Sequence, residues 1–550
     1  MKLRPYVLVL FAVVLAGRGH AATTAGQIPQ VFDFDRMDAN NLDMVVTNRG
    51  SVAFNLENGG PGLVYPKGSG HTVVFAAGPW IGSRTNDTLR LAIGEYSQEF
   101  GPGTMQNGGP VPDDPRFRNW RITRGNTSSF DFLNWPAGDG APVDAAGAPA
   151  LSGDDMIWSV YNDANPSDHT NNAGGTDPMG IEVRQSTFAF NRSGPLGNAI
   201  FLRFELRNAG FQSLDGVYFT FWSDPDLGGF TDDLAGCDTT RNLGYCYNAT
   251  NADAQYGSAP PAVGFDLLRG PVVTRFPGVS DTLGMTSFSK FINGTDPRAQ
   301  SESYNYMRGL HADGTDVHVN DDPFGPVTRY QVSGDPVTGT GWLDSNPSDR
   351  RTLVSSGPFT MNPGEAQEIV LAIIVGQGSD RLASITDLKN KSDQIQALFD
   401  TNKLRFLSIA APATKTVPEG QGLEFEVSAT DPDGGTIALT AGGLPLGASF
   451  TDAHDGTGTF SWVPAFNQAG DYVVRFTAET SGGSSESAET GIHVLDVNRS
   501  PVANPGGPYT GFVNIPLALD GGASSDPDGK LRFLGEDLQV ILLAKRAEDR

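Results

Sequence analysis

Apolar and polar residues alternate strictly along several segments of this chain, and this pattern limits the folds that it can adopt. From Leu202 to Arg207, every second residue is leucine or phenylalanine and the residues between them are charged. Successive side chains of a β-strand point to opposite faces, so this segment is expected to be a half-buried antiparallel strand. The segments 181–190 and 217–222 have the same pattern, whereas 368–375 is apolar on both faces and is expected to be a central strand.

Turn-forming residues are frequent throughout the chain, with 68 glycines and 37 prolines among 550 residues. This share is typical of many short strands joined by turns and is high for a helical protein. Only the segment 379–402 has apolar residues at helical spacing. The sequence therefore predicts an all-β fold, in which a large β-sandwich-type unit at 22–405 is closed by one helix.

Two Asp-Pro-Asp-Gly turns mark the last part of the chain, at 431–434 and 526–529. Around the first turn, the segments 424–429 and 472–478 alternate cleanly between apolar and polar residues. A second β-sandwich module is therefore expected at 406–497. A shorter fragment at 498–529 and an atypical tail at 530–550 would follow it.

Four elements of the module at 406–497 occur in an order known from one family. They are the first Asp-Pro-Asp-Gly turn, Gly-Leu-Pro-Leu-Gly-Ala-Ser-Phe at 443–450, Gly-Thr-Gly-Thr-Phe-Ser-Trp-Val-Pro at 456–464 and Gln-Ala-Gly-Asp-Tyr at 468–472. This order resembles the bacterial putative-Ig and dystroglycan-type cadherin-like modules. The resemblance implies an Ig-like, cadherin-like β-sandwich.

The fragment at 498–529 resembles the first half of a PKD domain, through its Pro-Gly-Gly-Pro-Tyr segment at 505–509 and the second Asp-Pro-Asp-Gly turn. The next strand of that family, with its aromatic core, is not found in 530–550. A partial PKD sandwich is therefore expected, from a truncated or frame-shifted C-terminus.

The region 180–400 resembles an uncharacterised N-terminal region of secreted surface proteins of Gram-negative bacteria. The segments that carry this resemblance include 242–248, 304–309, 341–344 and 356–365. Such proteins often end in a sorting or surface-attachment domain. The resemblance implies attachment to the outer membrane or cell surface through a C-terminal segment that is missing here.

The first 21 residues have the features of a secretory signal peptide. Lys2 and Arg4 precede an apolar run at 6–16, and Gly-His-Ala at 19–21 is an acceptable cleavage site. This run is too short to span a bilayer, and no later apolar run approaches the required length of about 20 residues. We therefore expect a secreted, extracellular or cell-surface protein without a transmembrane segment.

The formal net charge of −25 excludes nucleic acid as a partner, because a chain this acidic is repelled by phosphates. An acidic surface can bind multivalent cations, or it can simply keep an exported protein soluble. Both interpretations remain open at this point.

One acidic segment follows the strand predicted at 217–222. Five carboxylates in a turning loop can converge on one ion, and such hard oxygen ligands favour Ca²⁺. A solvated loop with Asx-turns is the alternative. The candidate ligands are Asp224, Asp226, Asp232, Asp233 and Asp238.

The two Asp-Pro-Asp-Gly turns supply further candidate calcium ligands at the ends of the modules. These are Asp431 and Asp433 in the first turn, and Asp526 and Asp528 in the second. Tight turns without an ion are the alternative, since proline and glycine there suit the turn backbone.

Cys237 and Cys246 are the only cysteines. Export permits them to form a disulfide that closes a small loop, and two free thiols are the alternative.

Catalytic signatures are missing from the sequence: it contains no His-Glu-x-x-His, Gly-x-Ser-x-Gly, phosphate-binding loop or Cys-x-x-Cys. We therefore expect a non-enzymatic, calcium-stabilised structural or adhesion protein that binds an extracellular glycan or protein surface. One alternative is a secreted glycan hydrolase in which 22–405 is catalytic and the modules are accessory. Another is a lectin-like carbohydrate-binding protein.

Overall fold

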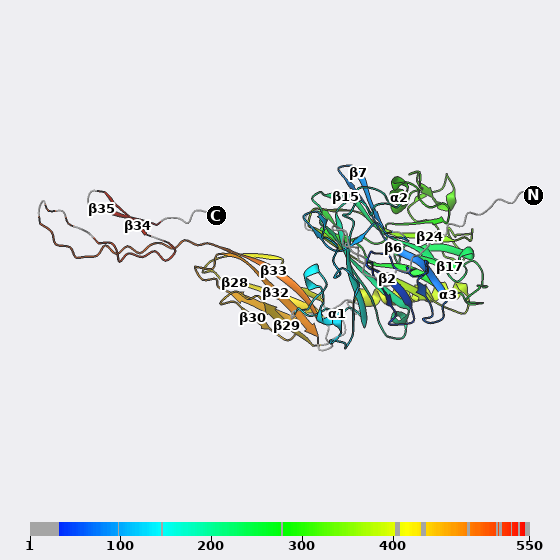
Figure 1. Cartoon of the computed structure of the whole chain (residues 1–550), viewed down its shortest axis with the longest axis horizontal. Coiled ribbons are helices and arrows are strands. Elements are labelled where there is room, and N and C mark those ends of the chain that lie inside the picture. The colour runs from blue at the N-terminus through cyan, green and yellow to red at the C-terminus, as the bar shows by residue number, and fades with distance from the viewer. Residues whose placement is uncertain are drawn as a thin grey trace, which may run out of the picture.

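β-Sheets make up most of the structure, as the alternation in the sequence predicts (Figure 1). The computed structural model describes residues 32–529, with gaps at 97, 145–146, 277–278, 402–407, 431–435, 481–484, 513–514, 516 and 518–519, and also 531–536 and 539–544. The predicted signal peptide at 1–21 lies outside these residues. Within them, the prediction of an all-β protein built from sandwiches is confirmed.

Two antiparallel sheets form the large unit, which we define as residues 32–401. The first sheet has the strand order β1 (Phe34–Met37), β2 (Asp43–Thr47), β5 (Leu63–Val64), β6 (Thr72–Thr85), β15 (Leu214–Pro225), β24 (Arg350–Met361) and β21 (Ser287–Ile292), with β7 (Thr88–Ile93) paired to β6. The second has the order β11 (Trp120–Thr123), β12 (Asp155–Asn162), β13 (Ile181–Ala189), β14 (Ala199–Asn208), β25 (Ala366–Gly376), β18 (Ala262–Arg269), β17 (Leu243–Asn248) and β16 (Asp233–Asp238), with β8 (Gly101–Pro102) paired to β12.

Short hairpins and helices decorate these sheets. The two-stranded pairs are β3 (Phe54–Asn55) with β4 (Gly60–Pro61), β9 (Met105–Gln106) with β10 (Gly109–Pro110), β19 (Val272–Phe276) with β20 (Val279–Thr282), and β22 (Val317–His318) with β23 (Val327–Thr328). The helices are α1 (Phe130–Leu133), α2 (Gln300–Met307) and α3 (Arg381–Asp400), with 3-10 turns η1 (Ala137–Asp139), η2 (Pro195–Asn198), η3 (Phe230–Asp232) and η4 (Val319–Asp321).

The main core lies between the two sheets. Phe204 of the second sheet packs against Phe219 of the first, with ring centroids 5.2 Å apart, and Phe221 packs against Phe265 at 5.7 Å. The apolar residues of the alternating segment in β14 all face this core. Burial of this many aromatic and aliphatic side chains is what holds the two sheets face to face.

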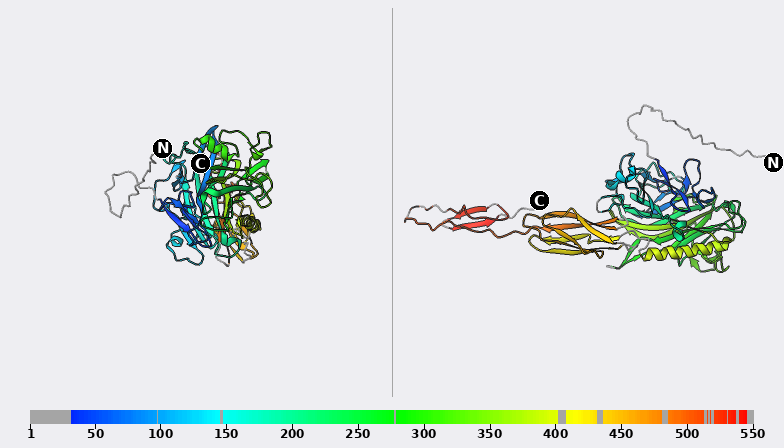
Figure 2. Two further views of the ribbon diagram at one scale, coloured as in Figure 1. Left: turned by 90° about the vertical axis from the view of Figure 1, so that its right-hand side faces the viewer. Right: turned by 90° about the horizontal axis from the view of Figure 1, so that it is seen from below.

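Helices cover the outer faces of both sheets. α3 packs on the second sheet (Figure 2). Its Ile385, Leu388 and Ile395 belong to one buried cluster with apolar side chains of β18 and β25. α2 packs on the first sheet, where Tyr304 and Met307 join a separate cluster. α3 lies within the segment 379–402 for which the sequence predicts a helix, and the Asp380 side chain caps its first turn.

β25 lies inside the second sheet, paired with β14 on one side and β18 on the other. Its alternate residues face the inter-sheet core and the α3 side, which explains why the segment 368–375 is apolar on both faces. The prediction of a central strand there is confirmed. At its end, the backbone of α3 approaches so closely that a Cβ on Gly376 would lie 2.4 Å from the Leu388 nitrogen.

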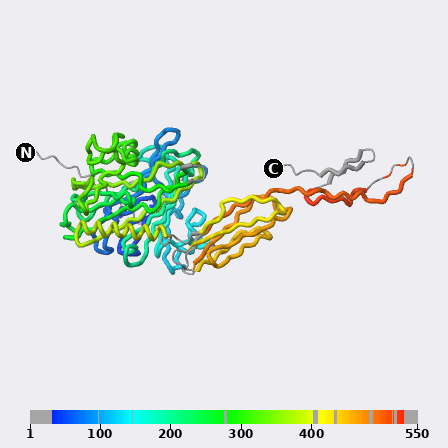
Figure 3. The backbone as a smooth tube through the Cα atoms, turned by 180° about the vertical axis from the view of Figure 1, so that it is seen from behind, coloured from blue at the N-terminus to red at the C-terminus, as the bar shows by residue number. Residues whose placement is uncertain are grey.

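A second sandwich follows at 408–495, which we call the C-terminal module (Figure 3). One sheet has the order β26 (Ser408–Ala410), β28 (Leu423–Thr430), β31 (Thr457–Trp462) and β30 (Ser449–Asp452). The other has the order β27 (Thr414–Pro418), β33 (Ser485–Leu495), β32 (Gly470–Thr480) and β29 (Ile437–Gly442). Phe425, Phe460 and Phe476 form the centre of its core, and Trp462 packs edge-on against Tyr472.

The described residues that follow the C-terminal module are extended (Figure 1). Between 498 and 529, the described residues form one isolated bridge, Val502 with Ser525, and a hairpin of β34 (Leu531–Glu536) and β35 (Gln539–Ala544) follows. None of the helices in the described part of the chain has the length and hydrophobicity needed to cross a lipid bilayer.

Candidate cation site

The acidic segment predicted to bind calcium connects the two sheets of the large unit. It begins at the end of β15 in the first sheet, turns at Gly228, passes through η3 and enters β16 of the second sheet. The turn needs a glycine, because φ is +68° and a Cβ on Gly228 would lie 2.2 Å from a carboxylate oxygen of Asp253. Asp224 and Asp226 lie before this turn, and Asp232 and Asp233 lie after it, so the predicted ligands fall into two groups.

The first group consists of Asp224, Asp226 and Asp349, each of which places an oxygen within 4.8 Å of the others. Asp349 was not among the residues that the sequence suggested. It lies just before β24, and the antiparallel pairing of β24 with β15 brings it beside the acidic segment. β15 and β24 are far apart in the sequence, so a local sequence pattern could not predict that Asp349 lies near Asp224 and Asp226.

Arg351 lies among these carboxylates. Its Nη1 atom is 2.6 Å from Oδ1 of Asp224, and it also contacts Asp349. The Tyr96 hydroxyl donates to the other oxygen of Asp224. A cation bound here would therefore share Asp224 and Asp349 with a guanidinium group.

The side chain of Asp226 makes no ion pair or hydrogen bond with another described residue, although the charge of Arg351 acts to lower its pKa. Burial raises its pKa to about 7, and the nearby charge of Asp349 adds to this effect. Burial also raises the pKa of Asp224 well above its usual value, although Arg351 opposes the change. A raised pKa means that the folded protein disfavours the ionised form of the carboxyl group. A bound cation would stabilise that ionised form.

The second group surrounds Asp233 and Asn248, which are direct partners in the pairing of β16 with β17. Both residues are fully buried, and the Oδ1 atom of each accepts no hydrogen bond from the described residues. The other oxygen of Asp233 accepts from the Leu227 N–H at 3.3 Å. An unpaired buried oxygen is costly, so this arrangement favours a bound positive charge.

Asp232 and Asp253 complete the second group. The side-chain nitrogen of Asn248 lies 3.2 Å from an oxygen of Asp232 and 3.4 Å from one of Asp253. Burial raises the pKa of Asp233 well above its usual value, and repulsion from Asp226, Asp232 and Asp253 adds to this shift. Like Asp349, Asp253 was not identified from the sequence.

Asp238 is separated from both groups, at the other end of β16. Its Oδ2 atom is 2.8 Å from Arg241 and 3.3 Å from Lys389. Burial by itself would raise its pKa, but hydrogen bonds from Thr240 and Arg241 lower it. The charge of Asp238 is thus already balanced by side chains of the protein.

The aspartates of the two Asp-Pro-Asp-Gly turns are placed differently. Asp431 and Asp433 lie outside the described residues. In the second turn, Asp526 accepts the N–H of Asp528 at 3.0 Å, and Asp528 binds the Arg499 guanidinium at 2.7 Å. That turn has the Asx-turn geometry that the sequence offers as the alternative to an ion.

The two cysteines are not joined in this structure, so the predicted disulfide is absent from it. They lie on adjacent strands, but Cys237 is opposite Gly244 and Cys246 is opposite Ala235. Such diagonal positions have Cα atoms about 7–8 Å apart, beyond the usual range of a disulfide. Both side chains pack in the core, and burial raises the pKa of both thiols.

Comparison with known protein families finds a match for one segment of the chain. The family model described as "Putative Ig domain" matches residues 406–495, which contain the C-terminal module. This confirms an Ig-like module there. No curated protein matches the chain.

Several solved structures are weakly similar to the chain. The SrpA adhesin from Streptococcus sanguinis is 15% identical over 18% of this chain and 63% of its own, with a TM-score of 0.15. An endo-fucoidan hydrolase from glycoside hydrolase family 107 is 20% identical over 21% of this chain and 22% of its own, with a TM-score of 0.17. A structure titled as a putative α-galactosidase from Bacteroides fragilis is 21% identical over 16% of this chain and 18% of its own, with a TM-score of 0.14. The chain thus spans less than two thirds of these proteins, and similarities of this extent bear on neither fold nor function.

Proposed function

We propose that this protein is a secreted or cell-surface structural or adhesion protein without catalytic activity, whose large β-sandwich unit is stabilised by calcium. The Ig-like module supports this class, because sandwich modules of this kind commonly serve as spacers or binding surfaces. Its partner would be an extracellular glycan or protein surface. The limits that we propose for its parts are 22–405, 406–497 and a partial PKD domain at 498–529.

One observation carries the calcium proposal: the excess of carboxylates where β15 leads into β16. Among the described residues, Arg351 is the one cationic side chain that contacts these carboxylates. Ca²⁺ takes six to eight oxygen ligands and tolerates irregular geometry, which suits carboxylates contributed by several loops. The carboxylates are Asp224, Asp226, Asp232, Asp233, Asp253 and Asp349.

Terbium luminescence provides a direct test of this site. Tb³⁺ replaces Ca²⁺ in oxygen sites and emits when an excited aromatic side chain lies nearby. Trp222 packs against Tyr96 with ring centroids 5.3 Å apart, and Tyr96 contacts Asp224. We expect emission that calcium displaces and that Asp226→Asn weakens, whereas Asp238→Asn leaves it unchanged. Absence of sensitised emission in the wild-type protein would contradict the proposal.

A glycan hydrolase is the second candidate, and two carboxyl groups with raised pKa values favour it. Burial raises the pKa of Glu95 to about 7, as it does for Asp226, and both groups interact electrostatically with Arg351. A carboxyl group that titrates near neutral pH can act as a general acid. Hydrolysis of a polysaccharide that is lost in Glu95→Gln would establish this function and refute the non-catalytic one.

A further inference from the structure

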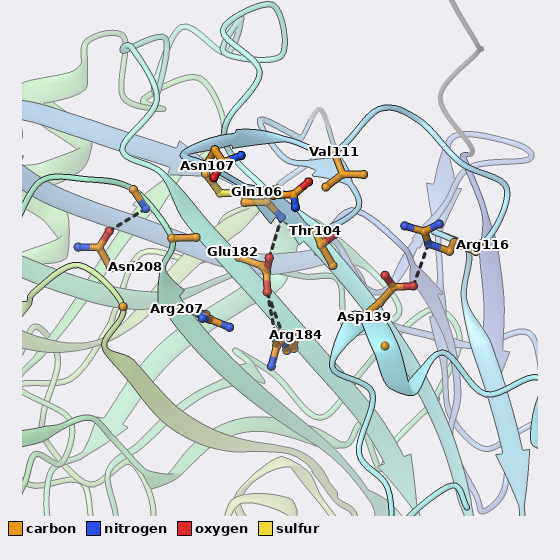
Figure 4. Close-up of a pocket in the computed structure, with 15 residues that line it drawn as sticks. Thr104, Gln106, Asn107, Val111, Arg116, Asp139, Glu182, Arg184, Arg207 and Asn208 are labelled. Carbon is orange, nitrogen blue, oxygen red and sulfur yellow. Dashed lines mark hydrogen bonds and ion pairs between the residues drawn. The ribbon is translucent and has the colours of Figure 1, made fainter. Parts of the chain in front are cut away.

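A polar groove lies on the outer face of the second sheet, beside the β9–β10 hairpin (Figure 4). Its floor is formed by Glu182 and Arg184 of β13 and by Arg207 of β14. The hairpin forms one wall, and Arg116 with Asp139 lies across from it. The cavity has a volume of about 530 Å³, which is in the range of sites that hold small ligands.

Two of the three arginines in the groove already have acidic partners. Arg116 Nε lies 3.0 Å from Asp139. Arg184 lies 3.1 Å from Glu182 and 3.2 Å from Glu205. These pairs fix the walls and floor and leave little positive charge of their own for a ligand.

Arg207 differs from the other two arginines, because it makes no ion pair or hydrogen bond with another described side chain. Glu182 is its direct partner in the β13–β14 pairing and would be the natural counter-ion. However, one oxygen of Glu182 accepts from Arg184 and the other accepts from the Met105 N–H at 2.7 Å. Figure 4 shows Arg207 pointing into the groove beside this occupied carboxylate. The groove thus presents one uncompensated guanidinium in a strongly acidic protein.

The β9–β10 hairpin beside the groove, and an aromatic ring packed on its turn, supply groups that suit a sugar. The side-chain amides of Gln106 and Asn107 make no hydrogen bond with other described residues, so they are free to bind hydroxyl groups. Phe211 is 72% exposed, and it lies directly over the hairpin turn, because a Cβ on Gly108 would be 2.4 Å from its ring. A flat aromatic face held in this way can pack against a sugar ring.

We propose that this groove binds an acidic saccharide whose carboxylate pairs with Arg207. The planar guanidinium matches a carboxylate in a bidentate manner, the amides of Gln106 and Asn107 contact hydroxyl groups, and the sugar ring lies against Phe211. This inference rests on the proposed function, in which the partner is an extracellular glycan or protein surface. The groove and the cation site share no residue, so either can fail without the other.

Isothermal titration calorimetry of the full chain tests this proposal. The probes are a hyaluronan tetrasaccharide, which carries glucuronate carboxylates, the same tetrasaccharide with its carboxylates reduced to alcohols, and a sulfated neutral tetrasaccharide. We expect the glucuronate form to bind with a Kd of about 0.1–1 mM and the reduced form at least ~10-fold more weakly. No binding of the glucuronate form, equal binding of the reduced form, or binding of the sulfated form alone would overturn the proposal.

Variants locate the site. Arg207→Ala should weaken binding about 10-fold, and Arg207→Lys should lose part of the affinity, because lysine cannot form the bidentate pair. Phe211→Ala should also weaken binding, whereas the exposed Arg298→Ala is the matched control. Melting temperatures equal to that of the wild type would show that these variants fold. Unchanged affinity in Arg207→Ala would overturn the assignment.

Discussion

Asp233 and Asn248 face each other across the β16–β17 pairing, and each places a buried side-chain oxygen where no described donor reaches it. Leaving such an atom unpaired costs about 1–3 kcal/mol, and more when the group is charged. Carboxylates of Asp226, Asp232 and Asp253 surround Asp233 and raise this cost further. A bound cation would satisfy both oxygens and neutralise the repulsion, which is why this pair is central to the proposed calcium site.

Asp226 gives the calcium-free protein a specific pH dependence. Its pKa in the folded state is about 7, above the usual value of 3.8, because of burial and the charge of Asp349. Between these two values the folded state binds more protons than the unfolded state, so stability falls as pH rises from about 4 to 7. Urea unfolding in chelator across this range should show the decline, and Asp226→Asn should reduce its slope. An unchanged slope in this variant would contradict the assignment.

Asp266 should make the stability of the large unit fall as pH rises from about 4 to 8. It is fully buried beneath α3, where Ser392 donates to one oxygen at 2.7 Å and the other oxygen lacks a described partner. Burial raises its pKa from the usual value of 3.8 to about 8. Between these two values the folded state binds more protons than the unfolded state, so stability falls as pH rises from about 4 to 8. Asp266→Asn should be more stable than the wild type at pH above 8, as measured by urea unfolding. A variant that keeps the full decline between pH 4 and 8 would refute this account.

Gly376 should be required for the packing of α3. A Cβ there would lie 2.4 Å from the backbone nitrogen of Leu388 and 2.5 Å from the carbonyl oxygen of Ser384, and neither atom can move without shifting the helix. Gly376→Ala should cost about 1–3 kcal/mol of unfolding free energy and increase hydrogen exchange in α3. Gly442→Ala is the control, because a Cβ there meets nothing within 4 Å. Equal stability of the two variants would show that the close approach is not needed.

Trp462 should stabilise the C-terminal module without affecting the large unit. It is 1% exposed, packs against Tyr472, and donates its indole N–H to the Leu446 carbonyl at 3.2 Å. Trp462→Ala should lower the stability of the module by about 3–5 kcal/mol. Calorimetry should then show one transition shifted to lower temperature and the other unchanged. A shift of both transitions would mean that the two sandwiches unfold as one unit.

Local patterns predicted the parts of the fold that depend on neighbours in sequence. The alternation in β14, the two apolar faces of β25 and the periodicity of α3 each reflect which side of one element is buried. The candidate site was predicted only in part, since Asp349 and Asp253 join it through contacts between distant segments. The segment 161–179 is a similar case: it is rich in glycine, aspartate and asparagine, yet the buried Asp163 in it accepts three backbone N–H groups. Such buried carboxylates follow from tertiary contacts that no local pattern records.

The most direct measurement of the central claim is the melting temperature of the full chain in calcium and in chelator, for the wild type, Asp233→Asn and Asp238→Asn. Calcium should raise the wild-type midpoint in proportion to the logarithm of its concentration above the Kd. Asp233→Asn should lose most of this rise and be at least as stable as the wild type in chelator, because it replaces a carboxyl group whose ionisation is opposed by burial and by neighbouring carboxylates. Asp238→Asn should retain the full rise, since Asp238 is paired with Arg241 and Lys389. A wild-type midpoint that is the same in calcium and in chelator would contradict the account.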